Sequence, residues 1–255
     1  MRRTLLGMSS MRTRFMAGLS ASWGGLKAGT RSAGVRRTYL QMVLALFLVS
    51  AVLDVAGIWA VLHWTDISTD AAWYTSVGLW IARILGILIV LLAAPLLSLT
   101  VVNLVFPFLG ERVFLASMRG VNPARAEQLA AAPGLPIMPS VWIQVRRLVT
   151  FVGMTLLVFL LSLLPVVGQV LAPVLQGYVS SRGLAWELLD PYFDKLGLRY
   201  AEQKAVVSQH GASMVGFGLP LTFVMAIPLA GPLFFGLAQA AAAQLVTEVI
   251  EAPTA

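Results

Sequence analysis

Long apolar segments alternate with shorter polar ones along this chain. The last two apolar segments, 34 and 37 residues long, carry no charged side chain at all. About 20 helical residues suffice to cross the roughly 30 Å hydrocarbon core of a bilayer. The pattern therefore predicts an all-α integral membrane protein with four apolar segments, at about 42–62, 79–106, 148–181 and 211–247.

The first two segments predict transmembrane helices. Residues 42–62 are long enough for one crossing. The loop after them carries Asp66 and Asp70 between tryptophans, which is typical of an outer membrane face with its aromatic belt. The segment 79–106 is longer than one straight crossing needs and contains Pro95, so we expect it to tilt or kink.

Each of the last two segments has a Pro-x-x-Gly sequence near its centre, Pro165 to Gly168 and Pro228 to Gly231. Proline ends a helix and glycine permits a reversal, which predicts two arms joined by a tight turn. Apolar arms of about 13–17 residues reach only roughly 20–26 Å. We therefore expect two half-membrane (re-entrant) helical hairpins with turns buried against protein. The alternative is a pair of single proline-kinked spanning helices.

The polar connector 182–210 joins these hairpins, and a re-entrant hairpin returns it to the cytoplasmic face. Asp190 and Pro191 predict a helix start, with Asp190 as N-cap, and Gly197 predicts its end. The connector is expected to lie on the surface with one apolar stripe, formed by Leu188, Leu189, Tyr192, Phe193 and Leu196.

Composition supports the membrane assignment and narrows the chemistry. The chain is 58% hydrophobic and 11% charged, about half the charged fraction of a soluble domain. It has no cysteine, which excludes disulfides and thiolate metal sites. Its only histidines, His63 and His210, are far apart in the chain, so we expect no metal and no cofactor.

Residues 1–39 form a basic segment with eight Lys or Arg residues and no acid. A basic block beside the first apolar segment predicts a cytoplasmic N-terminus. Apolar residues at helical spacing (Phe15, Leu19, Trp23 and Leu26) favour a helix in the membrane interface over a nucleic-acid arm. A disordered tail remains the alternative for residues 1–11. Residues 40–255 are then a single membrane domain, in which the basic region 107–147 is again cytoplasmic.

No sequence motif of an enzyme is present. The chain lacks His-Glu-x-x-His, a Walker A sequence and Gly-x-Ser-x-Gly. Transport without nucleotide hydrolysis is the first functional hypothesis, and a non-transporting scaffold that shapes the bilayer is the second.

Several stretches resemble, in their order, the CysZ sulfate permease family, which shares a domain with the etoposide-induced membrane proteins. They include "LLPVVGQVL", "WELLDPYFDKLGL", "GFGLPL" and "IPLAGPLFFGLAQAAAA". The resemblance implies a homo-oligomer in a bacterial inner membrane that passes sulfate, or a related oxyanion, for cysteine biosynthesis. It also implies two spanning helices and two half-membrane hairpins. With these elements and the basic N-terminal segment, we expect both termini on the cytoplasmic side. The order Asp190-Pro191-Tyr192 departs from the Asp-Tyr-Pro of many members.

A candidate sulfate site precedes the first span. Sulfate is bound by helix N-terminal N–H groups and guanidinium donors. Gly34, Val35, Arg36 and Arg37 match, apart from the valine, a stretch that the resembled family associates with sulfate binding. The alternative for the arginine pair is a topology anchor that contacts lipid phosphates.

Four charged residues are candidates for a pathway or gate: Asp54, Glu111, Arg112 and Glu187. An acid at membrane depth, such as Asp54, is costly and often functional, although a structural partner explains it equally well. For Glu111, Arg112 and Glu187 the first interpretation is interfacial ion pairs, and a role in gating is the second. Separately, the run Ala240–Ala243 predicts close helix packing.

Overall fold

The computed structural model describes residues 2–66, 72–105, 107–227 and 230–252, and all regular structure in these ranges is helical. This confirms the predicted all-α class. The helices, in order, are α1 (Arg2–Arg31), α2 (Ala33–Trp64), α3 (Trp73–Val105), α4 (Pro107–Val121), α5 (Pro123–Ala131), α6 (Ile137–Ser162), α7 (Val167–Leu188), α8 (Asp190–Lys195), α9 (Tyr200–Gln209), α10 (Gly211–Met225), α11 (Ala230–Leu245) and the π-helix η1 (Val246–Ile250).

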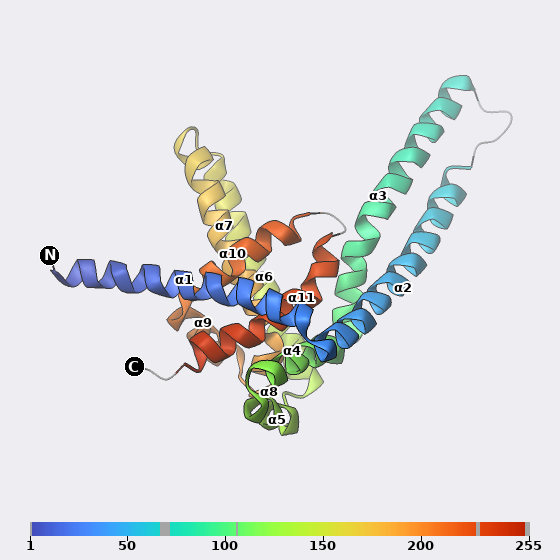
Figure 1. Cartoon of the computed structure of the whole chain (residues 1–255). Helices are drawn as coiled ribbons and strands as arrows, with labels where there is room; N and C mark the ends of the chain where they lie inside the picture. Colours follow the sequence, from blue (N-terminus) through green and yellow to red (C-terminus); the bar gives the residue numbers. More distant parts are fainter. Residues whose placement is uncertain (1, 67–71, 106, 228–229, 253–255) are drawn as a thin grey trace.

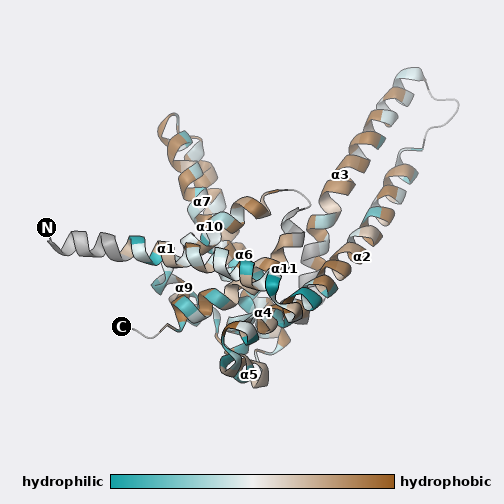
Figure 2. Ribbon diagram, in the orientation of Figure 1, coloured by the Kyte–Doolittle hydropathy of each residue, from teal (hydrophilic) through white to brown (hydrophobic). Residues whose placement is uncertain are grey.

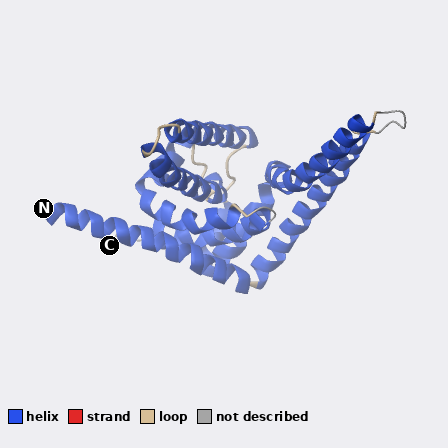
Figure 3. Cartoon of the chain, turned by 90° about the horizontal axis from the view of Figure 1, so that it is seen from above, coloured by secondary structure: helices blue, strands red, loops and turns tan. Residues whose placement is uncertain are grey.

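Helical hairpins rise to one side of a base that contains α4, α5 and α8 (Figure 1). The hairpin of α2 and α3 is the longest, and that of α6 and α7 stands apart from it. Both are apolar along most of their length, whereas hydrophilic residues are frequent around the base (Figure 2). Seen from above, the α2–α3 hairpin and the start of α1 occupy opposite ends of the molecule (Figure 3).

Three helices are long and apolar enough to cross a membrane: Ala33–Trp64, Trp73–Ser98 and Ile137–Ser162. The first contains the predicted span 42–62, and the second covers residues 79–98 of the predicted span 79–106. The third is the first arm of the predicted hairpin at 148–181, and it is longer than expected because helix α6 begins before the apolar segment does. With 26 residues in α6 and 22 in α7, length no longer argues against a full crossing.

The first Pro-x-x-Gly sequence forms the expected turn. Helix α6 ends at Ser162 and α7 begins at Val167, with Pro165 between them. Val166 adopts a φ of 63°, and a Cβ at Gly168 would lie 2.1 Å from the Leu161 carbonyl oxygen. Only glycine fits so close an approach, so the chain reverses here.

The second Pro-x-x-Gly sequence is described in part. Pro228 lies outside the described residues. Gly231 is buried, and a Cβ there would lie 2.5 Å from the Met225 carbonyl oxygen, so the end of α10 and the start of α11 meet at this glycine. Helices α10 and α11 have 15 and 16 residues, close to the arm lengths expected from the sequence.

Helix α1 is packed into the protein through its glycines. A Cβ at Gly18 would lie 2.0 Å from the Ser213 carbonyl oxygen of α10, and one at Gly25 would lie 2.5 Å from the Cα of Ala241 in α11. Of the apolar stripe expected to face lipid, Trp23 is 73% exposed. One face of α1 is therefore free to contact the membrane interface, as predicted for an interfacial helix. The opposite face packs directly against the backbone of α10 and α11, which the sequence did not predict.

The connector is buried more deeply than its charges suggest. Leu188, Leu189 and Phe193 are fully buried in one core with Phe114 of α4 and Phe217 of α10. The prediction of a surface-lying connector is therefore wrong for this stretch, because its apolar stripe packs against protein.

Of the two predicted ends of helix α8, only the C-terminal one is correct. Gly197, with a φ of 67°, follows the helix as predicted. At the start, Leu189 occupies the N-cap position and Asp190 already belongs to the helix, so the predicted Asp190 cap is wrong. The carboxylate of Asp190 binds Arg147 instead.

Small residues of α11 allow the expected close packing. Ala240, Ala241, Ala242 and Ala243 have no exposed surface. The hydroxyl of Ser117 in α4 donates a hydrogen bond of 2.7 Å to the Ala240 carbonyl oxygen. The alanine run therefore lies inside the packed core of this chain.

Candidate functional site

The corner between α1 and α2 holds the predicted sulfate-binding residues. Ser32 is the N-cap of α2, and its hydroxyl accepts a hydrogen bond of 3.4 Å from the Val35 N–H. The Val35 side chain is fully buried and lies close to Gly29 of α1. This buried valine fixes the start of the long helix against the core.

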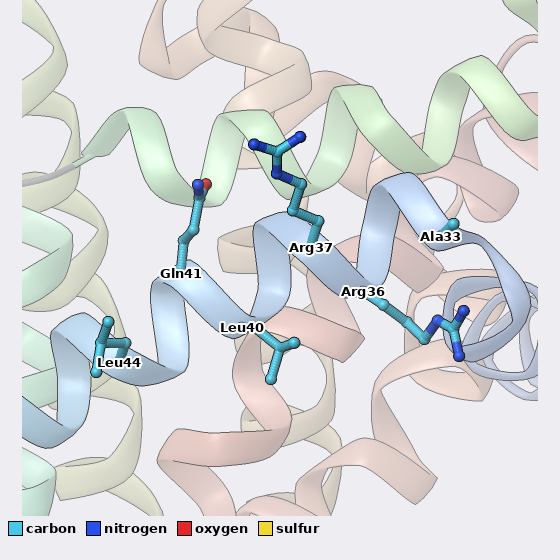
Figure 4. A pocket seen from close by; sticks show the side chains of 6 residues that line it. All are labelled: Ala33, Arg36, Arg37, Leu40, Gln41 and Leu44. Atoms are coloured by element: carbon cyan, nitrogen blue, oxygen red, sulfur yellow. The ribbon is translucent and has the colours of Figure 1, made fainter.

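The two arginines of this corner are exposed to solvent. They line a shallow pocket of about 540 Å³ together with Ala33, Leu40, Gln41 and Leu44 (Figure 4). None of the described residues forms an ion pair or hydrogen bond with the guanidinium group of Arg36 or Arg37. Two cationic groups without carboxylate partners can therefore bind an anion from outside.

Arg36 and Arg37 leave the helix in different directions, because successive residues of an α-helix are about 100° apart. In Figure 4 the side chain of Arg37 reaches toward α4, whereas that of Arg36 extends toward the turn between α1 and α2. The predicted residues thus share one helical turn, but their guanidinium groups do not converge on one point.

The other two predicted residues offer no side-chain donor to the pocket. Val35 points into the core, so its side chain does not face the pocket. Gly34 is exposed, and the atom nearest to a Cβ placed there is the Ser32 hydroxyl oxygen at 3.9 Å. The site has room for a side chain at position 34, so glycine is not needed there for space.

Asp54 lies about two thirds of the way along α2, among apolar residues. The hydroxyl of Ser50 donates a hydrogen bond of 3.4 Å to Asp54 Oδ2. The other carboxylate oxygen, Oδ1, is buried and has no hydrogen-bond partner among the described residues. The structure does not bring this acid into the pocket of the arginine pair.

Glu111 of α4 forms an ion pair with Lys195 at the end of α8, with 3.0 Å between Oε1 and Nζ. Lys195 also donates to the Ala132 carbonyl oxygen at 3.4 Å. Arg112 follows in the same helical turn and is exposed. Glu111 therefore joins α4 to α8 in the base.

The side chain of Glu187 is exposed near the otherwise buried end of α7, close to an ion pair that the sequence did not reveal. Arg147 of α6 lies 2.7 Å from Asp190 of α8, and Gln144 donates to the same carboxylate at 3.3 Å. Burial raises the pKa of Asp190 above its ordinary value, although Arg147 and Gln144 act in the opposite direction.

A second unforeseen cluster fixes the end of the chain. Arg125 of α5 donates through Nε to both carboxylate oxygens of Glu251, at 2.9 and 3.0 Å. The hydroxyl of Tyr192 donates to the same carboxylate at 2.8 Å. Burial, and then the carboxylate of Glu251, raise the pKa of Tyr192. Glu248 and Glu251 are the first acids after 37 uncharged residues, and this position was the only feature of the sequence that pointed to Glu251.

Arg83 of α3 caps the end of α2. Its guanidinium donates to the Thr65 hydroxyl at 3.1 Å and to the Thr65 carbonyl oxygen at 2.6 Å. The side chain also lies over the ring of Trp80, 5.2 Å from its centroid. This arginine therefore joins the far ends of the two longest helices.

These helices and their exposed apolar surfaces define an α-helical integral membrane protein. The family model described as "Sulfate transporter CysZ/Etoposide-induced protein 2.4" matches residues 26–235. The chain belongs to this family, which is of the transporter type and not an enzyme family. No curated protein matches the chain in a sequence comparison.

Proposed function

We propose that this protein is a sulfate permease of a bacterial inner membrane, which supplies sulfate for assimilation into cysteine. One observation carries the proposal. A member of a transporter-type family presents two exposed arginines, without carboxylate partners among the described residues, at the start of its first long apolar helix.

Sulfate needs no covalent chemistry, so transport requires only binding that is specific and reversible. Arg36 and Arg37 flank the pocket from two sides, and each supplies a planar set of N–H donors. The exposed start of α2 adds backbone N–H groups and the positive end of the helix dipole. Because both arginines remain open to water, the dianion is held weakly enough to be released.

The proposed topology places both termini and the 182–210 connector in the cytoplasm. It is supported by the eight basic residues of 1–39 and by hairpins that rise to the opposite side from the base (Figure 1). Helices α2 and α3 span the bilayer, whereas the two Pro-x-x-Gly hairpins re-enter it. Several copies of the chain form a homo-oligomer around the path of the ion.

The test is radiolabelled sulfate binding and flux in proteoliposomes. We expect Arg36→Ala and Arg37→Ala to weaken sulfate binding by roughly tenfold, since one charge-assisted contact is typically worth about 1.5–3 kcal/mol. Arg37→Lys should recover only part of the loss, because lysine lacks the two-pronged donor geometry.

Arg31→Ala is the matched control, since Arg31 is an exposed cation at the end of α1. It should leave flux unchanged. If both alanine variants at positions 36 and 37 insert normally and carry sulfate like the parent, the pair is only a membrane anchor.

A bilayer-shaping scaffold is the second candidate. It is favoured by the wide separation of the two long hairpins, whose apolar side chains are mostly exposed (Figure 1). Under this hypothesis, proteoliposomes would change in curvature or size with protein content, while sulfate flux would equal that of empty vesicles.

A further inference from the structure

A groove lies at the start of α6, well apart in the sequence from the arginine pair of α2. Its cavity volume is about 640 Å³. One wall comes from α6 and the segment before it, and the other comes from the start of α9. The lining residues include Pro136, Met138, Trp142, Arg146, Arg199 and Tyr200.

Two cations face this groove, and the structure holds one of them in place. The guanidinium carbon of Arg146 lies 4.7 Å from the ring centroid of Tyr200. That ring is itself fixed, since the Tyr200 hydroxyl lies 2.9 Å from the Thr150 hydroxyl and the ring stacks on Trp186. Arg199, the neighbour of Tyr200, is exposed beside it.

Neither cation is neutralised within the described part of the chain. The ion pairs there involve Arg125, Arg147 and Lys195, and none includes Arg146 or Arg199. The nearest acid on α9, Glu202, accepts instead from the Arg199 backbone N–H at 2.6 Å. The groove therefore carries two positive charges, which favour an anionic occupant.

The rest of the groove is apolar and lies at the border between charged and uncharged sequence. Met138 and Trp142 are 76% and 67% exposed. Beyond Arg147, 34 residues follow without a charge, and the exposed side chains of Val149 and Val152 continue along α6. Side chains of a helix point toward its N-terminus, so Arg146 reaches back toward the level of Trp142.

From this arrangement we propose that the groove binds the headgroup of an anionic phospholipid. The phosphate lies between Arg146 and Arg199, Trp142 contacts the polar end of the headgroup, and an acyl chain follows the exposed apolar side of α6 toward Val149 and Val152. A free inorganic anion fits less well, because it leaves the exposed apolar side chains of Val149 and Val152 without a partner. Basic pockets on helices at the membrane surface bind anionic lipid headgroups in this way.

Native mass spectrometry of the detergent-solubilised full chain, mixed with equal amounts of phosphatidylglycerol and phosphatidylcholine, tests the proposal. The parent should retain phosphatidylglycerol in preference to phosphatidylcholine. Arg146→Gln and Arg199→Gln should each lower that preference about fivefold, and the double variant should lose it. Arg119→Gln, which removes an exposed cation from α4, should keep the preference of the parent.

Three further measurements identify the occupant and check that the variants fold. Millimolar inorganic phosphate should not displace the lipid, and binding of phosphatidylglycerol should change a fluorescence component that Trp142→Phe removes. Circular dichroism should show the variants folded. The proposal fails if the folded double variant retains phosphatidylglycerol like the parent, or if inorganic phosphate displaces it.

Discussion

Arg147 joins two segments that are 43 positions apart, through its ion pair with Asp190. The two side chains are 13% and 24% exposed, so the pair is largely shielded from water. A charge left in such a place without its partner is strongly unfavourable. This single contact therefore controls how the base of the α6–α7 hairpin is attached to α8.

We expect Arg147→Met to lower the free energy of unfolding by about 2 kcal/mol at pH 7, because Asp190 loses its counterion. Burial already raises the pKa of Asp190, and without Arg147 that pKa rises further. The folded state then binds more protons than the unfolded state between the ordinary and the raised pKa. Lowering the pH through that window should therefore restore stability, which thermal unfolding in detergent at pH 7 and pH 5 would measure.

The control combines Arg147→Met with Asp190→Asn, which removes the unpaired charge. This double variant should be more stable at pH 7 than Arg147→Met alone and less sensitive to pH. An equal loss for Arg147→Met at both pH values would contradict the explanation.

The sequence pointed to some of the charged residues but not to their partners. Arg36 and Arg37 were predicted from their place before an apolar segment, and the structure leaves them exposed. Asp190 was assigned a capping role because Asp-Pro is a common helix start. Its real partner comes from another helix, and one sequence alone does not show which distant charges meet.

At the scale of elements, hydrophobic patterning predicted helices better than it predicted their contacts. It located α2, α3 and the turn at Pro165. It made α6 and α7 too short, since the arms were counted from uncharged residues only, whereas a helical backbone continues through Arg146 and Arg182. A helix ends where backbone hydrogen bonding stops, and charge alone does not stop it.

The glycine face of α1 was missed for a related reason. Periodicity methods weigh large apolar side chains, so they selected Trp23, which is exposed. The residues that bring α1 close to α10 and α11 are Gly18 and Gly25, which contribute almost no hydrophobic signal. Their seven-residue spacing was nevertheless visible in the sequence.

Gly18→Ala tests this packing. Its added Cβ would collide with the Ser213 carbonyl oxygen, a backbone atom that cannot move aside alone. We expect a loss of about 1–3 kcal/mol of stability, typical of overpacking. Trypsin should then cleave more rapidly at Arg12 and Arg14, since α1 is released from the protein.

Gly24→Ala is the matched control on the same helix. Its Cβ would meet only the end of the flexible Gln244 side chain, at 3.3 Å. Alanine favours the helix by up to about 1 kcal/mol over glycine, so this variant should be at least as stable as the parent. Equal stability of the Gly18→Ala variant would mean that α1 is not held by close packing.

At the scale of the whole molecule, the arrangement of hairpins on one side of a charged base makes the topology testable. Single cysteines can be placed in this cysteine-free chain at Ala72, Ala124 and Ala201, all of which are exposed. We expect an impermeant thiol reagent added to cells from the periplasmic side to label Ala72→Cys only, because the other two positions lie in or beside the base.

Labelling of Ala201→Cys from outside would contradict the proposed topology. It would mean that α6 and α7 contribute an odd number of crossings, as in the alternative of proline-kinked spanning helices. Labelling of all three variants after the membrane is permeabilised is the control that each cysteine is accessible.

The place of α1 against α10 and α11 has a consequence for the order of assembly during synthesis. The Ser213 hydroxyl donates to the Arg14 carbonyl oxygen at 2.9 Å, across 199 positions of the chain. At about 5–20 residues per second, the N-terminal helix waits roughly 10–40 s for this partner to leave the ribosome. Its glycine face stays uncovered meanwhile, and it closes only after the intervening helices have been inserted. Docking of the first helix is thus a late step of biogenesis, and a chain broken off before Ser213 cannot complete it.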